Sequence, residues 1–323
     1  LHDVNYLLLH GTADTAVLAD EGLAQYDRVA FQDGTDRLKA ALAIGGANHG
    51  QFATFGGRVD VPRLAGRLVN TEAVLDGDQQ RQVARVYVAA FLDATLKGVS
   101  EYRTLLRDWR TGAAWLPATD YAGLYADSGL RAIATFDEDV NLLTTAAAGG
   151  FSRGEGLTGW REAALTLRQG LARDNAALRL DWSSGGQYSL TIPDHLAREW
   201  SLNPGSALTF AAADARQPGK GLEPLDLTVE VIDAAGARGS IALSQVAPLP
   251  VRAPAQRLFR LGSLEERWLG PAGPVFQTYV IPLRDLMDGT GLNPATIRTV
   301  RFTFDRSPAG SLYLDDVGFF ERT

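Results

Sequence analysis

The spacing of apolar residues changes near residue 130, and the change divides the chain into two kinds of fold. Earlier in the chain, continuous apolar runs such as VNYLLLH (residues 4–10) and KAALAIG (39–45) are typical of short strands buried on both faces. Later, runs such as TVEVID (228–233) and IRTVRFTF (297–304) alternate apolar and polar residues, which is typical of strands with one solvated face. We therefore expect an α/β region followed by an all-β region.

The first region has the pattern of a βαβ unit. Residues 19–31 have helical character and lie between the two apolar runs. A strand, a helix and a strand in this order are typical of two parallel strands joined by a right-handed crossover. A longer helix is expected over about 79–97, with Asp78 as its N-cap and Gly98 after its last turn.

Two parallel strands are too few for an independent domain, because parallel sheets need both faces covered and are usually larger. Residue 1 is Leu, and the only methionine is Met287. We therefore expect residues 1–98 to be the C-terminal portion of a larger α/β domain, in a chain that is processed or that is part of a longer polypeptide.

One acidic residue and one histidine follow the two predicted strands. Asp14 lies in HGTADT just after the first strand, and His49 lies in GANHGQF just after the second. In an open parallel sheet, functional residues gather beyond the carboxyl ends of the strands. A carboxylate bound to a histidine fixes the imidazole tautomer, so the two residues could be the acid and the general base of a catalytic relay. The alternative is that Asp14 only forms a turn and His49 only caps a loop.

These motifs carry a resemblance to a known family. The runs LLLHGTADTAV and GANHGQF, followed by AAFLDATLKG, resemble the C-terminal part of an α/β-hydrolase of the serine esterase or peptidase kind. In that family the chain order is Ser, then Asp or Glu, then His. The resemblance implies that Asp14 is the acid, that His49 is the general base, and that no metal or organic cofactor is needed. It covers residues 1–98.

The nucleophile of such a relay is expected outside this chain. The sequence has one G-x-S-x-G match, GFSRG, with Ser152 at its centre. Its flanks lack the preceding strand and following helix of a nucleophile elbow, so a surface loop is the simpler interpretation. The resemblance places the serine in the N-terminal remainder of the same polypeptide, together with the oxyanion-hole donors. We therefore expect residues 1–323 alone to be hydrolytically inactive.

A connector and an all-β region follow. Residues 99–128 are predicted to be a connector whose aromatic residues pack across a domain surface. Residues 129–323 are predicted to form an antiparallel β-sandwich, because short strands recur between turn signals. The expected strands are 131–138, 159–168, 176–182, 187–193, 206–213, 225–233, 238–244, 275–283, 297–305 and 311–320.

The strand pattern of residues 129–323 resembles a jelly-roll domain of the galactose-binding or carbohydrate-binding-module type. The resemblance implies that exposed aromatic side chains could stack on a glycan. The candidates are Trp160, Trp182, Trp200 and Trp268. The alternative is that these side chains fill the core, as large aromatics usually do.

A structural calcium ion is a second possibility in the sandwich, because calcium binds several carboxylate and carbonyl oxygens. The first and last strands of a jelly roll can lie close together, and both carry acidic residues. These residues are Asp137, Glu138, Asp139, Asp315 and Asp316. The alternative is a solvated acidic rim.

Composition narrows the functions that are open to the chain. The net charge of −7 argues against a nucleic-acid partner, which needs clustered Lys and Arg. No apolar run approaches the roughly 20 residues that span a membrane, so no membrane partner is expected. The sequence has no cysteine, which excludes a thiol nucleophile but leaves the compartment open. Two functions remain: a serine hydrolase acting on an ester or a glycan-linked substrate, and a non-catalytic binding or scaffolding protein with a glycan-binding type of β-sandwich.

Overall fold

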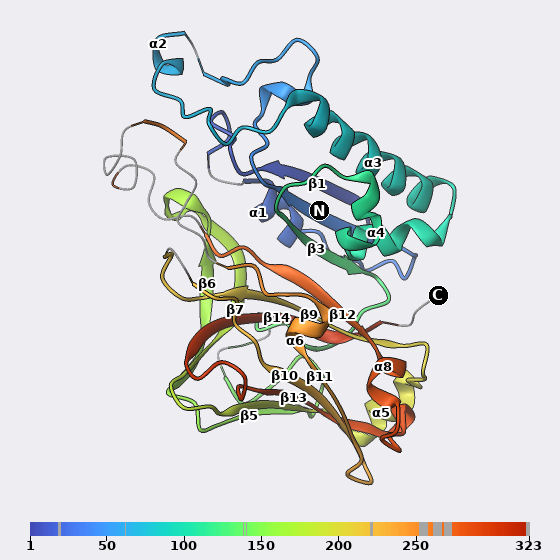
Figure 1. Ribbon diagram of the computed structural model, residues 1–323. Coiled ribbons are helices and arrows are strands. Elements are labelled where there is room, and N and C mark those ends of the chain that lie inside the picture. The colour runs from blue at the N-terminus through green and yellow to red at the C-terminus, as the bar shows by residue number, and fades with distance from the viewer. Residues whose placement is uncertain are drawn as a thin grey trace. The chain divides into compact units, whose positions relative to one another are not determined.

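The computed structural model contains two compact units (Figure 1). The structure describes residues 1–18, 21–61, 63–137, 139, 141–219, 222–251, 258–260, 267 and 273–320. The first unit consists of Leu1–Ser128, Leu165–Asn175 and Ala253–Gly273. The second unit consists of Gly129–Ala164, Ala176–Arg252 and Pro274–Thr323. The two units therefore do not follow each other simply along the sequence.

A three-stranded sheet lies at the centre of the first unit. β1 (Tyr6–Gly11) and β2 (Leu38–Ile44) pair in parallel, and α1 (Glu21–Asp27) lies between them in sequence. The predicted βαβ unit is therefore confirmed. β2 is buried along most of its length because it has a partner on both sides, whereas β1 is half-buried at the edge of the described sheet.

The third strand of this sheet differs from the expectation of a connector. β3 (Tyr121–Asp127) pairs antiparallel with β2. All its residues except one are buried, including Tyr121 and Tyr125. Because both faces of the strand are covered, its sequence YAGLYAD lacks the alternation by which a half-exposed strand is recognised.

Helices cover the sheet of the first unit. α3 (Gly77–Leu96) buries Val83, Tyr87, Ala90 and Ala94 along one stripe, as its apolar spacing predicts. Its N-cap is Asp76 rather than Asp78, because the Asp76 carboxylate accepts the backbone N–H of Asp78 at 2.9 Å. The shorter helices of this unit are η1 (Gly50–Phe52), α2 (Arg63–Gly66), η2 (Ser100–Tyr102), α4 (Arg103–Arg107) and η3 (Trp109–Trp115).

The second unit is an antiparallel β-sandwich, as the sequence predicts. One sheet has five strands in the order β11-β10-β13-β8-β5, and the other has six, in the order β12-β9-β14-β7-β6 with β4 beside β14. The strands are β4 (Arg131–Ala134), β5 (Phe151–Glu155), β6 (Gly159–Thr166), β7 (Ala172–Trp182), β8 (Gln187–Thr191), β9 (Ala207–Asp214), β10 (Thr228–Asp233), β11 (Arg238–Ala242), β12 (Gln277–Pro282), β13 (Ile297–Thr303) and β14 (Gly310–Phe320). Short helices lie between them at α5 (Asp194–Trp200), α6 (Leu243–Val246), α8 (Leu283–Met287) and η5 (Pro294–Thr296).

The sandwich core is built from the inward-facing side chains of both sheets. Trp182 of β7 stacks on Phe304 with ring centroids 4.4 Å apart, and Phe210 of β9 meets Phe302 of β13 edge-to-face at 5.1 Å. Burying a Val, Leu, Ile, Phe or Met side chain contributes about 1.5–3 kcal/mol. The alternation seen in the sequence therefore reflects one continuous apolar core.

The tip of the β6–β7 hairpin belongs to the first unit. It comprises residues 165–175 and includes η4 (Arg168–Gly170). The guanidinium of Arg173 donates to both carboxylate oxygens of Asp27, which is the last residue of α1, at 2.7 and 2.9 Å. Both side chains are about 95% buried, so the pair is shielded from solvent and holds the hairpin tip to α1.

Candidate functional site

The loops that follow β1 and β2 are held together by backbone hydrogen bonds. The N–H of Thr12 donates to the carbonyl of Ile44 at 3.1 Å, and the N–H of Ala13 donates to the carbonyl of Ala47 at 2.8 Å. Gly11 is required at this crossing, because a Cβ there would lie 2.3 Å from the Ala47 carbonyl oxygen. The glycine of the HGTADT motif therefore lets the two loops approach each other.

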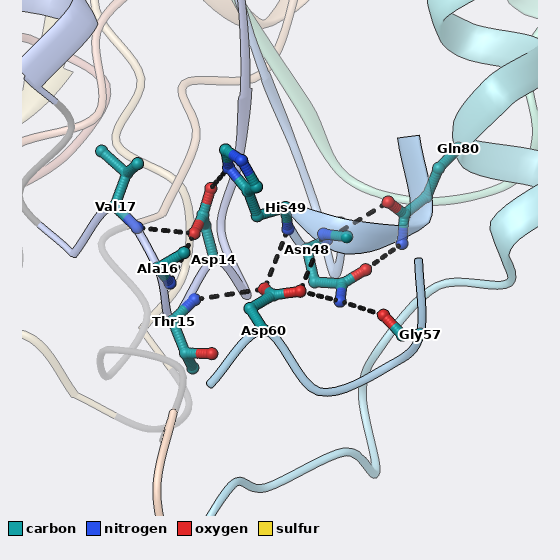
Figure 2. A network of polar contacts seen from close by, with 10 residues as sticks. Asp14, Thr15, Ala16, Val17, Asn48, His49, Gly57, Asp60 and Gln80 are labelled. Atoms are coloured by element: carbon teal, nitrogen blue, oxygen red, sulfur yellow. Dashed lines mark hydrogen bonds and ion pairs between the residues drawn. The ribbon is translucent and has the colours of Figure 1, made fainter. Parts of the chain in front are cut away.

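Asp14 and His49 meet at this end of the sheet, as the sequence analysis expects (Figure 2). The Asp14 Oδ2 atom lies 3.2 Å from His49 Nδ1. The other oxygen, Oδ1, accepts the backbone N–H groups of Ala16 and Val17, both at 2.8 Å. Asp14 is therefore both a turn former and the partner of the imidazole, with a separate oxygen for each role.

The exposure of the pair suits proton transfer. The Asp14 side chain is 10% exposed, whereas the His49 side chain is 61% exposed. A carboxylate can only accept, so Nδ1 carries the proton and Nε2 of a neutral ring keeps a lone pair. Within the described residues Nε2 makes no hydrogen bond. The geometry therefore leaves the second nitrogen of a largely exposed ring without a hydrogen-bond partner among the described residues.

A second carboxylate at the site, Asp60, is missed by sequence reasoning. It accepts hydrogen bonds from the backbone N–H groups of His49 at 2.9 Å and Gly50 at 2.7 Å. It also accepts from the Asn48 side-chain amide at 2.6 Å and from the Thr15 backbone N–H at 3.4 Å. Asp60 lies in RVDVP, which has no recognisable motif, so only the fold brings it to the site.

Two buried amides connect this loop to α3. Asn48 is 1% exposed and Gln80 is fully buried. The side-chain oxygen of Asn48, Oδ1, accepts from the side-chain amides of Gln51 at 3.0 Å and Gln80 at 3.1 Å. Gln80 in turn receives the Asn48 backbone N–H at 3.3 Å. Buried amides with their hydrogen bonds satisfied hold a single arrangement, so the residue before His49 is anchored to a long helix.

Ser152, His10 and His195 lie within regular secondary structure rather than in the loops that carry Asp14 and His49. Among the described residues no hydroxyl group is hydrogen-bonded to His49. Ser152 does not lie in the surface loop that the sequence predicts but within β5, where it is buried. Its hydroxyl donates to the Leu142 carbonyl at 2.5 Å. A serine in this setting is not at a strand-to-helix elbow. His10 lies in β1, and His195 lies in α5.

The tryptophans proposed as a glycan platform lie largely in the core. Trp182 and Trp200 are buried, and Trp160 packs against the core with its ring centroid 5.8 Å from that of Tyr188. Trp268 lies outside the described residues. The interpretation that these rings fill the core therefore holds for the three described tryptophans.

The acidic residues considered for calcium bind protein groups. β4 does pair with β14, as a jelly roll would require. However, Asp137 accepts the Ala176 N–H at 2.7 Å, and Asp139 accepts the Asn141 N–H at 2.6 Å. Asp315 is buried and accepts the N–H of Asp316 at 2.8 Å, while Glu138 lies outside the described residues. In the described part of the chain no group of three or more His, Asp or Glu side chains has the arrangement of a metal site.

The outward face of the five-stranded sheet carries a row of polar side chains. Glu230, Arg301, Ser189 and Arg153 lie opposite one another on β10, β13, β8 and β5. Arg301 donates to Glu230 at 3.0 Å and to the Ser189 hydroxyl at 3.2 Å. In the neighbouring row Phe151 lies opposite Thr191, with 52% of its surface exposed. This face therefore combines ordered charged groups with one open aromatic ring. Of the helices that the structure describes, none combines the length and apolar character that crossing a lipid bilayer requires.

No protein-family model matches the sequence, and no curated protein matches it. Among solved structures, a family 11 carbohydrate-binding module of a cellulosomal cellulase of Clostridium thermocellum is 10% identical, covering 60% of this chain and 95% of that one, with a TM-score of 0.36. A family 30 carbohydrate-binding module is 15% identical and has a TM-score of 0.31; the match covers 46% of this chain and 69% of the module. An exo-beta-agarase is 11% identical and has a TM-score of 0.34; the match covers 61% of this chain and 25% of the agarase. Values this low assign neither a family nor a function to this chain.

Proposed function

We propose that the first unit carries the acid and the base of a serine hydrolase, with a carboxylic ester as substrate. The observation that supports this is the contact between Asp14 and His49 beyond the carboxyl ends of two adjacent parallel strands. Asp14 would hold the Nδ1–H tautomer and stabilise the imidazolium. Nε2 would take the proton of a serine hydroxyl and then return it to the leaving alcohol.

The nucleophilic serine would come from polypeptide outside residues 1–323. Within the described residues no hydroxyl forms a hydrogen bond with His49. The Ser152 hydroxyl lies within β5 and donates to the Leu142 carbonyl. The half-buried strand β1 is the place where a further parallel strand could join the sheet. An acid and a base without a nucleophile or oxyanion donors have no path to an acyl-enzyme. The 323-residue chain alone is therefore expected to show no turnover of a nitrophenyl ester.

The test uses the full-length product of the gene. Fluorophosphonate labelling and nitrophenyl-ester turnover are measured for the wild type, Asp14→Asn and His49→Ala. We expect both variants to lose about 10⁴-fold in kcat, because loss of the correct tautomer or of the base costs that much in a triad. His195→Ala, which changes a histidine of the second unit, is the matched control and should keep full activity. Full activity of His49→Ala would refute the proposal.

A second candidate function, glycan binding by the second unit, is supported by the polar row on the five-stranded sheet. Sugar hydroxyls both donate and accept, so they suit charged side chains that are already held in place, such as Arg301 and Glu230. The exposed ring of Phe151 could cover an apolar face of a pyranose. Affinity electrophoresis against a panel of soluble polysaccharides tests this candidate.

The variants for this test lie at the open edge of the row. Arg153→Ala and Phe151→Ala change side chains that are mostly exposed, so the fold should survive. We expect either change to abolish retardation by a polysaccharide that retards the wild type. The matched control is Phe55→Ala, which removes an exposed aromatic ring from the first unit. If no polysaccharide in the panel retards the wild-type protein, this candidate function is rejected.

A further inference from the structure

The Asp60 carboxylate joins two segments that are far apart in sequence. Its donors are the backbone N–H of Thr15, which directly follows Asp14, and three groups of the histidine loop. Figure 2 shows that Asp60 lies on the side of the histidine loop away from the imidazole, with Asp14 on the ring side. Within the described residues Asp60 forms no hydrogen bond with the imidazole or with Asp14, but it accepts from the backbone next to each.

These contacts hold the backbone from which the His49 imidazole projects. His49 has φ −64° and ψ −52°, and its own N–H, the N–H of Gly50 and the amide of Asn48 all point at Asp60. With the backbone held on both sides, the His49 ring has only its two side-chain torsions left to adjust. The Asp14 carboxylate, which is held by Ala16 and Val17, then selects one orientation.

The backbone segments around Asp60 pack closely against each other. Gly50 and Gly56 meet so closely that a Cβ on Gly56 would lie 1.6 Å from the Gly50 carbonyl oxygen. A Cβ on Gly50 would lie 3.0 Å from Asp60 Oδ1 and from the Gly57 carbonyl oxygen. Glycines at these positions let the segment that carries Asp60 fold back onto the histidine loop. The local sequence is therefore arranged to bring this carboxylate under His49.

We propose that Asp60 is a positioning residue that sets the distance between the Asp14 and His49 loops and thereby holds the imidazole in its Nδ1–H tautomer. Its consequence for catalysis rests on the proposed hydrolase function, but its effect on the ring does not. Asp60 touches no reacting atom. It acts through the backbone of His49 and Gly50 on one side and of Thr15 on the other.

The chemistry of the carboxylate predicts that a neutral amide at position 60 cannot replace it. Asp60 accepts four hydrogen bonds with its two carboxylate oxygens. In Asp60→Asn one oxygen becomes an NH₂ group, which faces backbone N–H donors instead of accepting from them. At least one loop must then move away. Because the Asp14–His49 contact is already 3.2 Å long, a small movement is enough to break it.

The test measures which nitrogen of the His49 imidazole is protonated in the 323-residue chain. With ¹⁵N-labelled histidine, the nitrogen shifts of neutral His49 report which ring nitrogen carries the proton. We expect the Nδ1–H tautomer to predominate in the wild type and the Nε2–H tautomer to predominate in Asp14→Asn and Asp60→Asn. The other three histidines, which lie outside the site, serve as internal references.

The matched control is Asp233→Asn in the second unit. Asp233 also accepts several backbone N–H groups, from Ala235, Ala237 and Asn293. This change should lower stability but leave the His49 tautomer as in the wild type. If Asp60→Asn does not fold, Asp60→Ser, which keeps an accepting hydroxyl and relieves the donor–donor contact, is measured in its place. A folded variant at position 60 with the wild-type tautomer would overturn the proposal.

Activity of the full-length protein separates this inference from the hydrolase proposal. We expect Asp60→Asn to lower kcat about 10²-fold with little change in KM, because a misplaced catalytic group costs that much without weakening substrate binding. If the tautomer changes but His49→Ala keeps full activity, the hydrolase proposal fails while the positioning role stands. If His49→Ala is inactive but Asp60→Asn keeps both tautomer and kcat, only the positioning role fails.

Discussion

Asp60 in the first unit and Asp233 in the second unit form similar sets of hydrogen bonds with different consequences. Asp233 accepts the N–H groups of Ala235 and Ala237, both at 2.9 Å, and so closes the turn between β10 and β11. Asp60 accepts from loops that follow two different strands. Antiparallel neighbours are joined by short turns, so Oδ1 of Asp233 serves a local connection, while its Oδ2 accepts the N–H of Asn293 and ties the turn to the segment before β13. The loops at the carboxyl end of a parallel pair come from distant parts of the sequence, so a carboxylate there can assemble a site.

The two units also differ in what holds them together. The sandwich has one continuous core of apolar side chains from both sheets. The site end of the first unit is instead held by buried amides, carboxylates and close glycine contacts. Apolar burial is non-directional and tolerates small changes, whereas hydrogen bonds are lost over a few tenths of an ångström. We therefore expect substitutions in the second unit to change stability and substitutions at the site end to change geometry as well.

Trp182→Ala should give the largest loss of stability. The ring is buried and stacks on Phe304, so removing it leaves a cavity that costs about 3–5 kcal/mol in the free energy of unfolding. Urea unfolding followed by near-UV circular dichroism measures the loss. Phe151→Ala, at an exposed ring of the same unit, should stay within about 0.5 kcal/mol. Equal effects of the two changes would contradict the assignment of Trp182 to the core.

Arg173→Ala tests the polar support of the first unit. It leaves the Asp27 carboxylate buried without its bidentate partner, which costs about 3–5 kcal/mol. The neighbouring Arg28–Asp174 pair is more than half exposed, so Arg28→Ala should cost less than about 1 kcal/mol. Unfolding in urea at low and high salt compares the two, and a strong salt dependence of the Arg173 effect would argue that this pair is not shielded.

Gly11→Ala adds only one methyl group but should change the geometry of the site. Its Cβ would press on the backbone carbonyl of Ala47, at a cost of roughly 1–3 kcal/mol, and would push the two site loops apart. We expect the His49 imidazole to lose its Nδ1–H tautomer, as measured by ¹⁵N shifts. The control is Gly123→Ala in β3, where the nearest atom to a Cβ is 3.9 Å away and no change is expected. An unchanged tautomer in Gly11→Ala would mean that the loops tolerate separation.

Asp233→Asn should give the smallest effect on the site, with a cost in the free energy of unfolding of about 1.5–3 kcal/mol, as for a hydrogen bond to a charged acceptor. Burial raises the pKa of Asp233, but the N–H donors of the turn and of Asn293 lower it more, so the net pKa shift is downward. The stabilisation is therefore complete above the unfolded pKa of about 4 and is lost as pH falls through the lower folded pKa. The variant should lose this acid dependence, which urea unfolding between neutral and acidic pH would reveal. An unchanged acid dependence would assign it to another carboxylate.

Much of the fold was predictable because it follows from local patterns. The apolar runs at β1 and β2 indicated parallel strands, and the alternation in β10 and β13 indicated a sandwich. Two strands were missed for identifiable reasons. β3 is buried on both faces and shows no alternation, and β5 has glycines on both sides and one within it, which are typical of a loop. Trp182 and Trp200 were open to either interpretation, because sequence spacing alone does not say whether a ring faces the core or solvent.

By itself, the sequence determined that Asp14 and His49 follow consecutive strands, because parallel strands place their carboxyl ends at one edge. Only the tertiary structure decided that Asp60, Asn48 and Gln80 join them, because those contacts span up to 45 residues of chain and depend on how loops without regular patterns fold back. Periodicity records which face of a strand or helix meets the core. It carries no record of which loop donates to which carboxylate, since a single hydrogen bond leaves no repeating pattern in the chain.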